Sequence, residues 1–167
     1  MLLKIGVVTN TTETLTETTP PTPTTTQPPV YVELIEAQST GLIEVSACGI
    51  GSLEVIKLSL TSQSDNTLQI AILPGTIFES QSAGVQSMIV ITEKLVLLYP
   101  HETAKSISVD AACASMELDA PSESDSLTLS TEAPPEDLVK LLNLPDFHEE
   151  TFCVQQFAIW TITDNPG

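Results

Sequence analysis

The stretch that decides the fold is SISVDAAC, residues 106–113. Ile107, Val109, Ala111 and Cys113 occupy every second position of it, so they share one face of an extended chain. The polar residues Ser108 and Asp110 fall between them. Because successive side chains of a strand point to opposite faces, this spacing predicts a β-strand with one face in a core. We therefore expect Cys113 to be buried.

Similar short apolar segments occur on both sides of this strand. They span 30–38, 42–48, 53–60, 67–73, 85–92, 94–99 and 126–130. Turn-forming sequences rich in Gly, Ser, Asn, Asp and Pro separate them, as in GIGS, SQSDN and LPGT. This spacing is typical of an antiparallel sandwich or barrel. We expect a mainly β fold and, of these two architectures, an antiparallel β-sandwich of about eight strands.

Two short helices are predicted after the last strand. The first follows Pro135, a favoured first helical residue, and carries leucines at helical spacing. The second is predicted to begin at Asp146, where Asp146 and Glu149 fit a capping box, and to end before Asn165, which precedes a proline. Its apolar residues cover most of its circumference, so we expect it to pack against the sheet.

The sequence before the predicted strands has a different amino-acid composition. Residues 9–29, TNTTETLTETTPPTPTTTQPP, are a Thr/Pro-rich tract of the kind found in extended linkers and glycosylated stalks. Asn10 lies in an N-glycosylation sequon and is a candidate glycan attachment site. The sequence thus predicts two parts: residues 1–29, an N-terminal strand and linker arm, and residues 30–167, a β-domain with C-terminal helices.

The charge balance narrows the range of functions. The chain has 22 acidic residues, five Lys and no Arg, for a net charge of −17. Such a surface is poorly suited to nucleic acid or to anionic membranes, which attract Lys and Arg. The many Thr and Ser residues favour an extracellular, cell-surface location. No apolar run reaches the roughly 20 residues of a membrane-spanning helix.

Catalytic and metal-binding patterns are absent from the sequence. It contains no nucleophile elbow, phosphate-binding loop or dinucleotide fingerprint, and its two histidines stand far from its three cysteines. We therefore expect no enzyme activity, no cofactor and no metal ion.

The N-terminal arm begins with a short apolar segment, LLKIGVV, at residues 2–8. Leu3, Ile5 and Val7 alternate with other residues, which suits a strand that pairs with another sheet. The Thr/Pro tract could span roughly 65 Å at about 3.1 Å per residue, farther than one domain. We expect this segment to enter the β-domain of a second copy, so that repeated contacts build a homopolymeric filament.

That layout resembles the donor-strand surface filaments of archaea and the chaperone-assembled pili of bacteria, in which an N-terminal extension enters the neighbouring β-domain. The resemblance implies a structural, pilus-like subunit of an extracellular filament.

A second resemblance lies in QQFAIW, residues 155–160. This segment resembles the Gln-x-Ala-Ile/Val-Trp motif of Gram-positive thioester domains, which are surface adhesin modules. The resemblance implies that Gln156 is the glutamine of an internal Cys-Gln thioester, with Cys113 or Cys48 upstream in the chain; the local pattern around the cysteine occurs only at FCV, residues 152–154. The alternative function is therefore a stalked surface adhesin domain.

Simpler roles remain open for the same residues. Gln156 could be a buried amide that hydrogen-bonds between helix and sheet. Three cysteines allow one disulfide with three pairings, among them Cys48 with Cys113. A secreted binding module is the third class of function that the sequence leaves open.

Overall fold

The computed structural model describes residues 27–164. The predicted donor strand and Asn10 lie outside the described residues. The strands are β1 (Val30–Glu33), β2 (Ile43–Cys48), β3 (Val55–Ser62), β4 (Leu68–Ile72), β5 (Ile77–Ser80), β6 (Met88–Val90), β7 (Lys94–Leu98), β8 (Lys105–Cys113) and β9 (Ser126–Leu129). The helices are α1 (Leu34–Ser39), α2 (Glu136–Leu142), the 3-10 helix η1 (Pro145–Glu149) and α3 (Phe152–Thr163).

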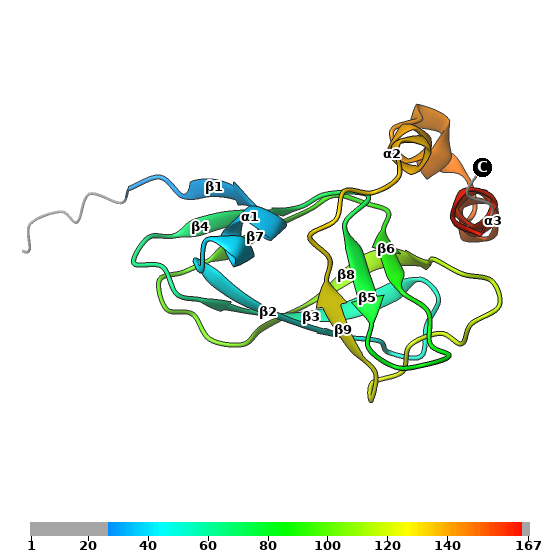
Figure 1. Cartoon of the computed structure of the whole chain (residues 1–167). Helices are drawn as coiled ribbons and strands as arrows, with labels where there is room; N and C mark the ends of the chain where they lie inside the picture. Colours follow the sequence, from blue (N-terminus) through cyan, green and yellow to red (C-terminus); the bar gives the residue numbers. More distant parts are fainter. Residues whose placement is uncertain (1–26, 165–167) are drawn as a thin grey trace, which may run out of the picture.

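Six of the strands form a closed barrel in the order β2-β3-β8-β6-β5-β9, and every neighbouring pair is antiparallel (Figure 1). The short strand β9 closes it, because it pairs with β2 at one edge and with β5 at the other. The other three strands form a sheet in the order β1-β4-β7, in which β1 runs parallel to β4. The mainly β fold is confirmed, but six strands close into a barrel where we expected a sandwich.

Strand β8 has the two faces that its sequence predicts. Val109, Ala111 and Cys113 are buried, whereas Ser108 and Asp110 are exposed. The three buried residues belong to one hydrophobic core, which also includes residues from β3, β4 and β6.

The prediction was wrong at the N-terminal side of the domain. Residues 30–38 were expected to form one strand, but the strand ends at Glu33 and α1 follows. Leu34 and Ala37 stand three positions apart and are both buried in the core, which suits one face of a helix. Thr40 then ends this helix by donating its hydroxyl to the Glu36 carbonyl at 2.7 Å.

The second C-terminal helix also differs from its prediction. It begins at Phe152, and the predicted capping residues belong instead to η1, whose N-terminus has no side-chain cap. Phe147 in η1 is buried, which holds this turn against the body. The carbonyl of Phe147 accepts a 2.8 Å hydrogen bond from Gln155 Nε2, so η1 is also tied to α3.

Helices α2 and α3 cover one part of the barrel wall. A second apolar cluster joins them to β6, β8 and the residue after β6; its buried members are Ile89, Ile91, Ala112, Leu138, Leu142, Phe147 and Ile159. This packing explains why β6 is apolar on both faces. Figure 1 shows these helices at one end of the molecule and the β1-β4-β7 sheet at the other, with the barrel between them.

Candidate functional site

The candidate site joins α3 to the end of β8. Gln156 is 3% exposed, and its side-chain amide contacts the backbone of Cys113, which lies 43 positions earlier. The backbone N–H of Cys113 donates to Gln156 Oε1 at 2.9 Å, and Gln156 Nε2 donates to the Cys113 carbonyl at 2.8 Å. The amide of Gln156 thus forms both hydrogen bonds that a neighbouring strand would form.

The register of the barrel explains why a side chain is needed there. Along β8, the backbone groups of alternate residues point to opposite neighbours. Ala111 N–H donates to Glu54 beside β3, and Ala114 N–H donates to Ser87 beside β6, both at 2.9 Å. Cys113 therefore faces the β3 side, but β3 begins only at Val55, which pairs with Asp110. Gln156 completes the ladder beyond the start of β3.

The sulfur of Cys113 lies in the barrel core. Its Sγ is 3.7 Å from Met88 Sδ and 4.0 Å from the Leu53 carbonyl. Burial raises the pKa of the Cys113 thiol to about 12, since a thiolate would lose its hydration there. At neutral pH the thiol is therefore protonated.

A test of this burial uses alkylation of the native protein by iodoacetamide. Cys153 is exposed and should react quickly, whereas Cys113 should stay unlabelled in the native protein. The raised pKa also gives a pH dependence: the protonated Cys113 stabilises the fold fully below the ordinary thiol pKa of 9.0, and this stability is lost as pH rises through about 12. Peptide mapping by mass spectrometry measures the labelling, and labelling of native Cys113 as fast as that of Cys153 would contradict its burial.

Apolar side chains on the surface surround the pair. Leu53, whose carbonyl meets the Cys113 sulfur, is 42% exposed, and Phe157, beside Gln156 in the chain, is 61% exposed. The ring of Phe157 packs edge-on against Trp160, with centroids 5.5 Å apart. Trp160 packs against the barrel core, and its Nε1 is buried without a hydrogen-bond partner among the described residues.

The structure does not bring Cys48 and Cys113 together. All three cysteines are free thiols. Cys48 follows the inward-facing Ala47 on β2 and takes the outer face of the barrel wall, as Ser46 does, whereas Cys113 takes the inner face. Side chains on opposite faces cannot form a disulfide without backbone movement. Of the predicted site residues, the structure thus unites Gln156 with Cys113 alone.

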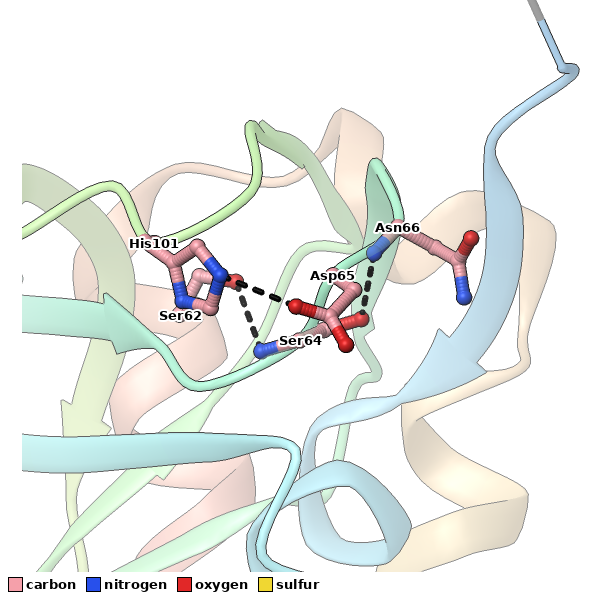
Figure 2. Close-up of polar contacts among 5 residues, drawn as sticks. All are labelled: Ser62, Ser64, Asp65, Asn66 and His101. Atoms are coloured by element: carbon pink, nitrogen blue, oxygen red, sulfur yellow. Dashed lines mark hydrogen bonds and ion pairs between the residues drawn. The ribbon is translucent and has the colours of Figure 1, made fainter.

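A second polar cluster lies between the β3–β4 and β7–β8 loops (Figure 2). His101 Nε2 is 3.0 Å from Asp65 Oδ1, and both side chains are largely exposed. The two serine hydroxyls nearby accept from backbone N–H groups: Ser62 Oγ from Ser64 at 3.3 Å, and Ser64 Oγ from Asn66 at 3.0 Å. These serines shape the loop, and no contact described for them joins a hydroxyl to the histidine. The cluster therefore links two loops and lacks the geometry of a Ser-His-Asp site.

The described part of the chain offers neither a cluster of metal ligands nor a membrane-spanning helix. Within residues 27–164, no three His, Cys, Asp or Glu side chains gather closely enough to hold a metal ion. None of the helices in that range combines the length and apolarity needed to cross a membrane.

The comparisons with known proteins do not assign the chain to a family. No family model matches the sequence, and no curated protein or solved structure gives a significant match. The resemblance of residues 155–160 to thioester domains therefore rests on those residues alone.

Proposed function

We propose that this chain is an extracellular surface adhesion domain in which Cys113 and Gln156 form an internal thioester. The contact between the Gln156 amide and the backbone of Cys113 carries this proposal, because it places the glutamine of the motif beside the main chain of one cysteine of three. The charge of −17 and the Thr/Pro tract support a stalked, cell-surface location.

The chemistry of the bond is a simple exchange. The sulfur of Cys113 adds to the amide carbon of Gln156, so that a C–S bond forms and the C–N bond breaks. Nε2 then leaves as ammonia and takes the thiol proton with it. The Cys113 N–H, 2.9 Å from Oε1, can stabilise the negative charge that develops on that oxygen. Because the thiol of Cys113 is protonated, this proton transfer must accompany the addition.

A thioester would suit an adhesin because it is an electrophile protected from water. The buried position of Cys113 and Gln156 excludes solvent from the bond. An amine of the target that enters this buried site could then replace the sulfur, which would leave a covalent amide between target and Gln156 and return Cys113 to the thiol.

Intact mass spectrometry tests the thioester. We expect native protein to be lighter than its sequence by about 17 Da, the mass of the ammonia lost when a side-chain nucleophile displaces the amide nitrogen. Methylamine should remove this deficit and add its own mass at Gln156. Cys113→Ser should show the full mass, whereas Cys48→Ser should keep the deficit. Full mass in the native protein, with no methylamine adduct, would leave Gln156 as a structural amide only.

A second candidate function is a structural subunit of an extracellular filament. It is favoured by the position of the two ends of the body (Figure 1). Strand β1, which follows the arm, lies at one end, and helices α2 and α3 lie at the other. A contact from the arm of one copy to the far end of the next would be head-to-tail, and such a contact does not close on itself.

A further inference from the structure

A groove lies between α2, α3 and the barrel wall. Its volume is about 610 Å³, within the range of binding sites in proteins. The lining is mostly apolar and includes Ile77, Ile89, Ala114, Leu138 and Ile162, with Glu136 and Asp137 among its polar members. Neither the thioester candidate nor the polar loop cluster includes any of these residues.

We propose that this groove binds residues 2–8 of a second copy of the chain. The inference rests on the second proposed function, the filament subunit, and assigns its acceptor site. In LLKIGVV, the alternating residues Leu3, Ile5 and Val7 would face one side of an extended segment. An apolar row of this kind matches the apolar floor formed by Ile77, Ile89 and Ile162.

Charge favours the same occupant. Glu136 and Asp137 at the groove share one cation, Lys140, whose Nζ lies 2.9 Å from Glu136 Oε1 and 3.1 Å from Asp137 Oδ1. Two carboxylates and one ammonium group leave a net charge of about −1 at this edge of the groove. Lys4 is one of only five basic residues in the chain, and it stands within the apolar segment. An extended segment with Leu3 and Ile5 in the groove would turn Lys4 away from the floor, where it can reach the carboxylates.

The arrangement of the fold suits a donor from a second copy. The chain enters the body at β1, and Figure 1 shows β1 at the end opposite to α2 and α3. The nearest contacts of β1 are with β4 and α1. Copies aligned end to end would place the entry point of one body beside the groove of the next.

The test compares two apolar residues of α3 in the full-length chain. Ile162 lines the groove and Val154 does not. Ile162→Asp should weaken assembly about a hundredfold or more, because an unpaired charge would face the apolar segment. Val154→Asp, on an exposed part of the same helix, should leave assembly unchanged. Electron microscopy and light scattering measure assembly, and circular dichroism checks that both variants are folded.

The arm is tested from the other side of the contact. The full-length double variant Ile5→Asp/Val7→Asp should stay monomeric and should bind a synthetic peptide of residues 1–10, whereas the same variant carrying Ile162→Asp should not bind it. A charge exchange adds specificity: Lys4→Glu should weaken assembly, and Glu136→Lys with Asp137→Lys should restore it.

The outcomes separate the groove from the filament. Native protein that forms no filaments would overturn the filament function itself. Filaments that depend on Ile5 and Val7 but tolerate Ile162→Asp would keep the filament and overturn the groove as acceptor. The wild type could instead be monomeric and fail to bind the peptide, while the double variant binds it. This result would show that each chain fills its own groove and would overturn the second copy as donor.

Discussion

Replacement of Gln156 by leucine is expected to lower the free energy of unfolding by about 2–6 kcal/mol. The substitution removes both partners of Cys113, whose N–H and C=O would stay buried at the end of β8. Each unsatisfied buried group costs about 1–3 kcal/mol. Urea denaturation followed by circular dichroism measures the loss, and it is best measured in a Cys113→Ala background, in which no thioester can form.

Gln155→Leu is the matched control for this experiment. Gln155 is also buried on α3, but its amide makes a single described bond, from Nε2 to the Phe147 carbonyl. We expect about half the effect of Gln156→Leu, because only one buried carbonyl loses its donor. A loss for Gln156→Leu of less than about 1 kcal/mol would mean that water reaches Cys113 and replaces the amide, which would contradict a dry site.

The second large effect is expected at Gly49, immediately after β2. A Cβ atom added there would lie 1.9 Å from the backbone oxygen of Pro121 and 2.7 Å from the Pro121 Cβ. Because the obstacle is mainly backbone, the loop around Pro121 would have to move, and we expect Gly49→Ala to cost about 3 kcal/mol or more. Thermal unfolding followed by circular dichroism measures this cost.

Gly51 provides a comparison in the same loop with a different cause. Its φ of +73° favours glycine, but an added Cβ would meet nothing within 4 Å. Gly51→Ala should therefore cost only about 1–2 kcal/mol, the conformational cost of a left-handed residue. Equal losses at Gly49 and Gly51 would show that the loop around Pro121 yields easily, contrary to the prediction.

Local patterns predicted the strands whose two faces differ. Strand β8 alternates from Ser106 to Ala111, and its more and less exposed residues follow that alternation, whereas Ala112 is buried on the other face by the second apolar cluster. Strand β5 was missed because its four residues, IFES, begin with two adjacent apolar residues and do not alternate as the four residues of β9 do. The closure of the barrel was missed for another reason: it depends on β9 pairing with both β2 and β5, and strands of a sandwich alternate in the same way as strands of a barrel.

The candidate site was predictable only in part. The motif identified Gln156, and alternation along β8 placed Cys113 in the core, but neither revealed that β3 begins too late to pair with Cys113. That absence of a strand partner is what gives the Gln156 amide its two hydrogen bonds. The groove could not be predicted, since it draws residues from β5, β6, α2 and α3, and no local pattern links these elements.

The parallel pairing of β1 with β4 has a mechanical consequence. Strand β1 is the first strand of the body, and its four residues pair in register with Leu68–Ala71. Figure 1 shows β1 directed from its own end of the molecule towards the end that carries α3. A tensile load between the two ends would pull β1 along its own axis, so its hydrogen bonds to β4 would bear the force together in shear. They would not open one after another, so β1 would resist extraction under a load applied at its N-terminal end.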